Sequence, residues 1–300
     1  MSVKASSGQI KRVVVPLLDW PSQRVISKAL VSVLPATHYQ VRYRQMSEEK
    51  LWGAMARDRV DFQIEIWQAS ADEDFQVMLD KGRLIDLGTH AAITREDWWY
   101  PEHVAKLCPG LPDWRALNRC AELFSRDGSG LGAYLTGPWP YRDPDLIRSL
   151  QLKFKIVRHS DSDSIWQEMA QAVKDNRAIV LLNWTPNWTD QRFAGQFVEF
   201  PEYTPECETD PRWGINKTLA FDCGNVKRGW IKKAGSVNLP KDKPCLYQYL
   251  KNVNLSGEMI AYASVLVDYE KLSEEAASKA WLARYRTDVD QWYGASCLAG

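Results

Sequence analysis

Short apolar runs alternate with helix-forming segments along the first 95 residues, and this alternation constrains the fold most strongly. The run 13–18 and the alternating segments 41–44 and 61–67 have the pattern of strands. Segments 23–34 and 47–57, which lie between them, have the pattern of helices. Strands separated by helices form parallel sheets with helices on both faces. The chain is therefore predicted to have an α/β fold.

The same pattern resumes after about residue 95. Segments 154–157 and 178–182 are predicted strands, and segment 164–176 between them is a predicted amphipathic helix. A further predicted strand, 218–221, is expected to lead back to the first lobe, followed by the C-terminal helices. The sequence thus predicts two lobes joined by two crossings, near 93–96 and 200–210. The predicted boundaries are 1–94 with 206–300 for lobe I, and 95–205 for lobe II.

Tryptophan is unusually abundant, with 14 residues in 300. Trp20, Trp67 and Trp184 each follow the end of a predicted strand, and Trp99 follows the first crossing. In open parallel sheets, ligands bind at the carboxyl ends of the strands. The face of an indole attracts a quaternary ammonium group, which has no hydrogen bond to donate. Because indole also stacks on sugars, tryptophan alone leaves a carbohydrate-binding protein as an alternative.

The charge balance excludes some classes of partner. Lys+Arg and Asp+Glu both number 38, so the formal net charge is zero and nothing indicates binding to nucleic acid. No apolar run approaches 18 residues, which argues against a membrane span. Residues 1–9 lack the apolar core of an export signal. The chain is either cytoplasmic or an exported protein without its signal, and we expect a periplasmic or other extracytoplasmic location.

The six cysteines lack the spacing of a zinc site. Cys108 and Cys120 flank one short turn-rich segment, and Cys207 and Cys223 flank another. Both segments suit disulfides, and buried free thiols are the alternative. The two remaining cysteines have no assigned role: Cys245 and Cys297.

Four motifs occur in a sensible order: Leu18-Asp19-Trp20-Pro21-Ser22, then Val60 to Trp67, then Trp98 to Val104 with Pro109 to Trp114, and finally Asn183 to Trp188. With these motifs the chain resembles the glycine betaine, choline, carnitine and proline-betaine class of ABC importer substrate-binding proteins. Asn187 departs from the family pattern, which commonly has histidine there. Another departure is that Arg59-Val60 contains no glycine before Asp61.

The resemblance implies a type II periplasmic-binding-protein fold, in which each of two lobes has a central sheet flanked by helices and the ligand cleft lies between the lobes. It implies a monomer that delivers a small methylated amine to membrane permease subunits, without catalysis or a cofactor. Segment 203–224, with its cysteine pair, is similar to the branch that binds trimethylamine N-oxide. The implied aromatic box is Trp20, Trp67, Trp99 and Trp184.

Two nearby residues are further candidates for ligand binding. Tyr100 is an alternative to Trp99, because the register of Trp98-Trp99-Tyr100-Pro101 against the family motif is ambiguous. Glu102 is a candidate partner for a protonated or hydrated N-oxide, although an acid at a helix N-terminus also interacts favourably with the helix dipole.

Two other chemistries remain open from the residues. Glu65 and Asp19 lie beside tryptophans and form the carboxylate pair of an alternative glycosidase. A structural Ca²⁺ is a weaker prediction, because the spacing of the candidate oxygen ligands is not that of an EF-hand. Those candidate ligands are Asp210, Asn216 and Asp222.

Overall fold

The computed structural model describes residues 10–297 and the side chains of 10–294. The predictions about an export signal in residues 1–9 and about the side chain of Cys297 therefore lie outside the described residues. The chain divides into two compact units. Within the described residues, the first unit contains 10–66, 72–92 and 231–297, and the second contains 67–71 and 93–230.

The first unit begins with the alternation that the sequence indicates. The parallel strands β1 (Lys11–Leu17) and β2 (Tyr39–Gln45) flank α1 (Pro21–Ser32), and α2 (Glu48–Met55) leads to β3 (Phe62–Trp67). Strand β10 (Gly229–Ser236) lies between β3 and β4 (Leu84–Pro101) in the larger sheet, and α3 (Gln68–Asp80) precedes β4. All six residues of β3 are buried, as expected for a central strand covered on both faces.

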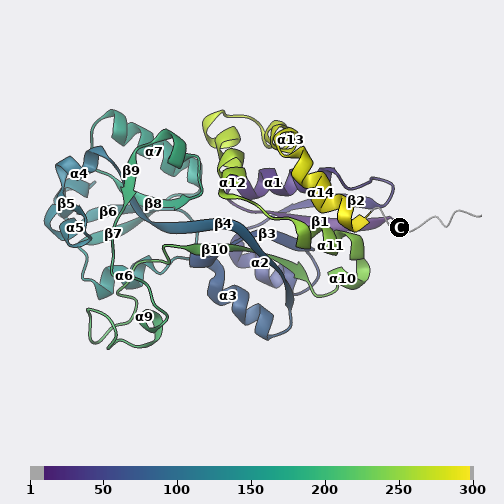
Figure 1. Ribbon diagram of the computed structural model, residues 1–300. Helices are drawn as coiled ribbons and strands as arrows, with labels where there is room; N and C mark the ends of the chain where they lie inside the picture. The colour runs from purple at the N-terminus through teal and green to yellow at the C-terminus, as the bar shows by residue number, and fades with distance from the viewer. Residues whose placement is uncertain (1–9, 298–300) are drawn as a thin grey trace, which may run out of the picture. The chain divides into compact units, whose positions relative to one another are not determined.

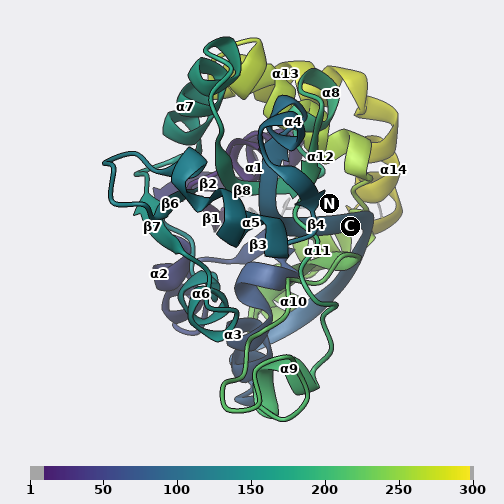
Figure 2. The same cartoon turned by 90° about the vertical axis from the view of Figure 1, so that its left-hand side faces the viewer.

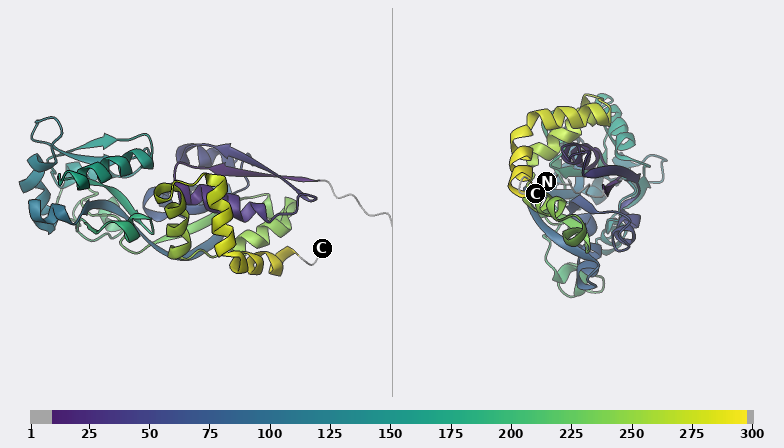
Figure 3. Two further views of the ribbon diagram at one scale, coloured as in Figure 1. Left: turned by 90° about the horizontal axis from the view of Figure 1, so that it is seen from above. Right: turned by 90° about the vertical axis from the view of Figure 1, so that its right-hand side faces the viewer.

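The C-terminal helices complete the first unit. Helices α12 and α13 both contact α1, and α14 contacts α11 (Figures 1 and 3). Serine hydroxyls accept hydrogen bonds at two helix starts: Ser256 from Met259 N–H and Ser273 from Ala276 N–H, both at 3.3 Å. The elements are α10 (Leu239–Asp242), α11 (Pro244–Asn252), α12 (Gly257–Ser264), the π-helical turn η2 (Val265–Tyr269), α13 (Glu274–Arg284) and α14 (Arg286–Cys297).

The second unit has its own part of the sheet, in the order β4, β8, β6, β7, with β9 beside β4. Strand β6 is parallel to β7 and β8, whereas β4 is antiparallel to β8. Right-handed crossovers from β6 to β7, and back over β6 to β8, place α6 and α7 on opposite faces of the sheet (Figures 1 and 2).

The elements of this unit after β4 are α4 (His103–Leu107), β5 (Pro109–Pro112), α5 (Arg115–Cys120), η1 (Ala121–Phe124), β6 (Gly132–Thr136), α6 (Asp143–Ser149), β7 (Phe154–Arg158), α7 (Ser162–Lys174), β8 (Val180–Thr185), α8 (Thr189–Arg192), β9 (Gly195–Phe197) and α9 (Glu206–Thr209). No helix among the described residues is both long and apolar enough to cross a membrane.

The predicted return to the first lobe is corrected by the structure. Segment 218–221 is irregular, and the returning strand is β10. The final return to the first unit therefore lies at Trp230–Ile231 rather than within 200–210, and the chain also enters the second unit briefly at 67–71, which was not predicted. Residues 206–230 stay with the second unit because they fold onto α6: Ser149 Oγ donates to Ala220 O (2.6 Å).

Candidate functional site

Two indole rings meet at the carboxyl edge of the second unit's sheet. Trp184 is the penultimate residue of β8, and Trp139 lies in the loop after β6. Because β6 and β8 are parallel neighbours, their carboxyl ends reach the same edge. The centroids of the two rings are 5.3 Å apart and the ring planes are 78° apart. Both residues are 6% exposed.

The backbone around Trp139 holds its ring in place. A Cβ at Gly137 would lie 2.3 Å from Trp139 Cζ3, so this ring position requires glycine. Arg158 donates to the carbonyl oxygens of Gly137 (3.2 Å) and Trp139 (3.5 Å). Among the described residues, no atom accepts a hydrogen bond from the buried Nε1 of Trp139. Trp139 was missing from the sequence predictions.

Further indoles pack against Trp184 and continue the cluster. Trp166 of α7 lies 5.2 Å from Trp184 and 5.8 Å from Trp188, measured between ring centroids. Trp188 in turn makes an edge contact with Phe193. These contacts hold the ring of Trp184 in place, as in an ordinary aromatic core.

A buried carboxyl group lies beside Trp184. Glu96 of β4 is directly opposite Trp184 in the β4–β8 register, so the two side chains share one face. Tyr141 Oη donates to Glu96 Oε2 (2.6 Å), and Ala69 N–H donates to Oε1 (3.1 Å). Burial raises the pKa of Glu96 to about 7, and the hydrogen bonds from Tyr141 and Ala69 oppose that rise.

Trp67 enters the same unit through the start of α3. It is the last residue of β3 and is 4% exposed. It precedes by two residues Ala69, whose N–H binds Glu96. Gln68 accepts a hydrogen bond from Trp230 N–H (3.2 Å). Segment 67–71 is thus tied to β4 and to the segment that leads into β10.

Trp20 belongs to the first unit, where a second buried carboxylate orients it. Trp20 Nε1 and Ser22 Oγ each donate to Glu65 Oε2 at 2.8 Å. Glu65 is fully buried. Its carboxylate serves as a structural acceptor, and the glycosidase alternative with Asp19 has no support. The prediction that Trp20 shares a site with Trp184 stays a prediction.

The structure places Trp99, Tyr100 and Glu102 away from the Trp139–Trp184 pair. Trp99 pairs with Leu181 in register and so points to the sheet face opposite Trp184, where its ring covers Gly195. Tyr100 is fully buried, and its hydroxyl donates to Gln196 (3.2 Å). Glu102 is exposed at the start of α4, and its side chain makes no capping bond.

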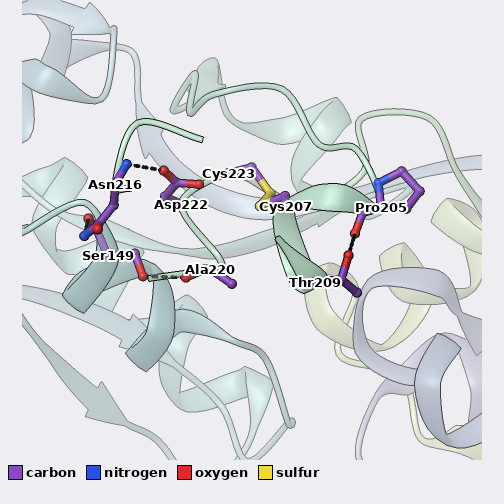
Figure 4. The surroundings of a disulfide bond; sticks show 8 residues. All are labelled: Ser149, Pro205, Cys207, Thr209, Asn216, Ala220, Asp222 and Cys223. Atoms are coloured by element: carbon purple, nitrogen blue, oxygen red, sulfur yellow. Dashed lines mark hydrogen bonds between the residues drawn. A yellow bond between two sulfur atoms is a disulfide. The ribbon is translucent and has the colours of Figure 1, made fainter. Parts of the chain in front are cut away.

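The predicted cysteine pairs are both disulfides: Cys108–Cys120 and Cys207–Cys223. Cys245 is also disulfide-bonded. Figure 4 shows the second bridge, where Asp222 accepts from Asn216 N–H (2.6 Å).

The weaker Ca²⁺ prediction stays a prediction. The Asp210 carboxylate is turned to Arg212 (2.9 Å), and Asp222 accepts from the backbone of Asn216. In the described part of the chain, Asp, Glu, His and Cys side chains form no group of three suited to a metal ion. The three predicted oxygen ligands have hydrogen-bond partners within the protein.

Comparisons with known proteins agree with this architecture. Residues 11–284 match the model of the substrate-binding domain of ABC-type glycine betaine transport systems. The trimethylamine N-oxide-binding protein of Pelagibacter ubique is 34% identical over 284 residues, covering 91% of this chain and 88% of the relative.

Solved structures share the fold at lower identity. Lactococcal OpuAC with glycine betaine has a TM-score of 0.71 at 17% identity, over 94% of this chain and 99% of that one. An ABC-transporter choline-binding protein with choline has a TM-score of 0.74 at 15% identity, over 96% and 93%.

Proposed function

Because the chain belongs to the family of substrate-binding domains of ABC-type glycine betaine transport systems, we propose that its own solute is a trimethylated amine, and specifically trimethylamine N-oxide. Proteins of this family bind small solutes for ABC transporters and are not enzymes. The ligand of the Pelagibacter relative supports the choice of the N-oxide.

The observation that carries the proposal is the Trp139–Trp184 ring pair beside Glu96. Indole faces attract a methylated cationic nitrogen by about 2 kcal/mol or more when the contact is desolvated. Trp139 Nε1, a donor without an acceptor among the residues that the structure describes, lies on the same ring pair and suits an oxygen acceptor on the ligand. Trimethylamine N-oxide offers both groups on adjacent atoms.

Glu96 supports a choice between solutes of the class. A betaine carries a full carboxylate charge at a distance from its methylated nitrogen, whereas the N-oxide oxygen is bonded to that nitrogen, so an ionised Glu96 repels the betaine more strongly. Glycine betaine is therefore expected to bind at least about tenfold more weakly than the N-oxide.

Isothermal titration calorimetry with trimethylamine N-oxide, glycine betaine and choline tests the proposal. Saturable one-site heat with the N-oxide, and recovery of the ligand unchanged, is the expected result. Glucose and maltose serve as controls for a sugar site. Heat from a sugar but from none of the three amines contradicts the proposal.

The partners and location follow from the same family. We propose that the protein works as a monomer outside the cytoplasm and delivers its ligand to membrane permease subunits. The disulfides Cys108–Cys120 and Cys207–Cys223 support an oxidising compartment. Size-exclusion chromatography with light scattering, with and without trimethylamine N-oxide, checks the monomer.

A further inference from the structure

Glu96 is a buried acid beside the aromatic pair. Aromatic rings can bind a methylated nitrogen without such an acid, so its presence calls for a separate explanation. It is 3% exposed and lies on the same sheet face as Trp184. Both of its oxygens accept hydrogen bonds from the protein, from Tyr141 and Ala69. In its ionised form this carboxyl group therefore presents negative charge, and no proton, to a ligand beside Trp184.

The charge of Glu96 has opposite consequences for two kinds of ligand. A trimethylammonium group without an oxygen anion is attracted by the carboxylate, at the low dielectric of a buried site. The oxygen of an amine N-oxide is negative and is repelled by it. When Glu96 is protonated, the repulsion of the N-oxide oxygen becomes an attraction, because the neutral carboxylic acid has a proton to donate to that oxygen.

We propose that the protein binds trimethylamine N-oxide with a proton on Glu96, taken up from solvent, and binds a purely cationic ligand such as choline with Glu96 ionised. This inference rests on the proposed function and adds a proton to its binding equilibrium. The proton bonds to a Glu96 carboxyl oxygen and is donated toward the ligand oxygen, and no covalent bond of the ligand changes.

The groups around Glu96 make it the site of this proton. Tyr141 faces it from the loop before α6, the backbone N–H of Ala69 from the first turn of α3, and Asn225 binds its carbonyl oxygen (2.7 Å). On β4 itself, Arg95 and Asp97 flank it and point to the other sheet face. Asp97 is the neighbour that also titrates near neutral pH, since burial raises its pKa to about 7.

The proton count of binding is the direct test. Calorimetry of the whole protein in two buffers of different ionisation heat, at each pH, gives the protons exchanged for each ligand. At about pH 8 Glu96 is mostly ionised in the free protein, so the N-oxide takes up close to one proton and choline exchanges about none. Near pH 6 free Glu96 is mostly protonated, so choline releases close to one proton and the N-oxide exchanges about none.

Affinities then respond to pH in opposite directions. Affinity for the N-oxide falls by up to about tenfold for each pH unit above 7, whereas affinity for choline falls similarly for each unit below 7. Glu96→Gln is expected to remove both dependences, because the amide is neutral at every pH. It keeps N-oxide binding within a few fold of the wild-type value near pH 6, and it weakens choline at pH 8 by at least about tenfold.

Asp97→Asn is the matched control, because it removes the neighbouring acid on the same strand and leaves Glu96. It is expected to keep both opposite slopes. Equal proton counts for the two bound ligands in wild-type protein would overturn the inference and leave the proposed function intact. Opposite slopes that persist in Glu96→Gln but vanish in Asp97→Asn would also overturn it. Absence of heat from any methylated amine is a different result, and that outcome contradicts the proposed function itself.

Discussion

At the scale of single residues, Trp139 combines an indole face with a donor that has no protein partner among the described residues. Trp139→Phe keeps a ring but removes the N–H and part of the electron density. We expect affinity for trimethylamine N-oxide to fall about three- to tenfold. The smaller ring leaves a cavity that lowers the free energy of unfolding, but no buried hydrogen bond is lost, because the N–H made none within the described protein. Calorimetry and thermal unfolding measure the two effects.

Trp98→Phe is the control for this substitution. Trp98 stacks on Tyr134 (centroids 3.8 Å apart) and donates from Nε1 to Asp143 (2.8 Å). Trp98→Phe removes this buried hydrogen bond and should lower the free energy of unfolding by about 1–3 kcal/mol. Affinity in the folded variant should remain near that of the wild type. If Trp139→Phe instead lowers stability without lowering affinity, and Trp98→Phe lowers affinity, then Trp139 is a packing residue and not a binding residue.

Glu65 orients Trp20 by accepting a hydrogen bond from the indole N–H. Glu65→Ala leaves the buried donors Trp20 Nε1 and Ser22 Oγ without their acceptor. The free energy of unfolding of the first unit should therefore fall by about 2–4 kcal/mol. Glu65→Gln retains an amide oxygen as acceptor and should lose less. Urea unfolding followed by tryptophan fluorescence ranks the variants, and equal stability of Glu65→Ala and wild type contradicts this role.

The placement of single residues shows what the sequence can and cannot predict. Trp184 and Trp67 were predicted from strand ends, because a run of apolar residues shows where a strand stops. Trp99 was predicted because it follows the first crossing near 93–96, but β4 continues through that crossing to Pro101 and its alternation turns Trp99 to the other face. A strand that continues from one unit into the next has no local signal in the sequence.

At the scale of elements, β6 explains why Trp139 was missed. Its five residues follow the glycine-containing segment 127–131 and were not recognised as a strand, so the strand end before Gly137-Pro138-Trp139-Pro140 was not recognised either. The signal was present, since Trp139 follows the end of a buried five-residue run, as Trp20, Trp67 and Trp184 follow theirs. The parallel pairing of β6 with β8 brings the two tryptophans together. This pairing joins strands that are far apart in the sequence, so no local pattern shows it.

The loop after β6 is also the element most sensitive to a single methyl group. Gly137→Ala places a Cβ 2.3 Å from the ring of Trp139, so the ring must move. We expect affinity for trimethylamine N-oxide to fall at least about tenfold, because a misplaced ring loses its contact with the ligand. The pairing of β6 with β7 should persist. Calorimetry measures the affinity, and far-ultraviolet circular dichroism verifies the fold.

Gly195→Ala is the matched comparison, because its Cβ would lie 1.9 Å from the ring of Trp99. The same kind of clash there should lower the melting temperature without a specific loss of affinity in the folded protein. A large affinity loss from Gly195→Ala together with none from Gly137→Ala would return Trp99 to the binding site in place of Trp139.

At the scale of the whole molecule, the first crossing was predictable and the second was not. The first was placed near 93–96 and lies between residues 92 and 93, although β4 runs through it without a break. The final return lies at Trp230–Ile231 because segment 206–228, which its own disulfide closes into a loop, is bound to α6 by the hydrogen bond from Ser149 to Ala220. An irregular segment held by such contacts has no periodicity in its apolar residues. The sequence pattern therefore does not show which of the two units the segment belongs to.

The two units contain buried titratable groups of opposite kind. In the second unit, burial raises the pKa of Glu96 and Asp97 to about 7 and that of Asp143 to about 6. In the first unit, burial lowers the pKa of His90 to about 3. His90 is held between Ile64 O (2.8 Å) and Leu255 N–H (2.9 Å), an arrangement that requires its neutral form.

These groups predict opposite responses of the two units to acid. An acid whose pKa is raised by folding adds stability that is complete below its unfolded value of about 4 and is lost as the pH rises through its folded value. The second unit should therefore gain stability as the pH falls from about 7 to about 5, by up to about 1.4 kcal/mol per pH unit for each group. A histidine whose pKa is lowered has the reverse effect, so the first unit should lose stability as the pH falls below about 6.5.

Hydrogen exchange with mass spectrometry at about pH 5, 6.5 and 8, corrected for the intrinsic exchange rate, follows peptides of each unit separately. We expect opening free energies to rise with acid in peptides of β6 and β8 and to fall in peptides of β3 and α12. His90→Gln should remove most of the acid loss in the first unit and leave the second unit unchanged. If both units shift in the same direction in wild type and variant alike, the buried groups do not control the pH response, and the net charge of the chain becomes the better explanation.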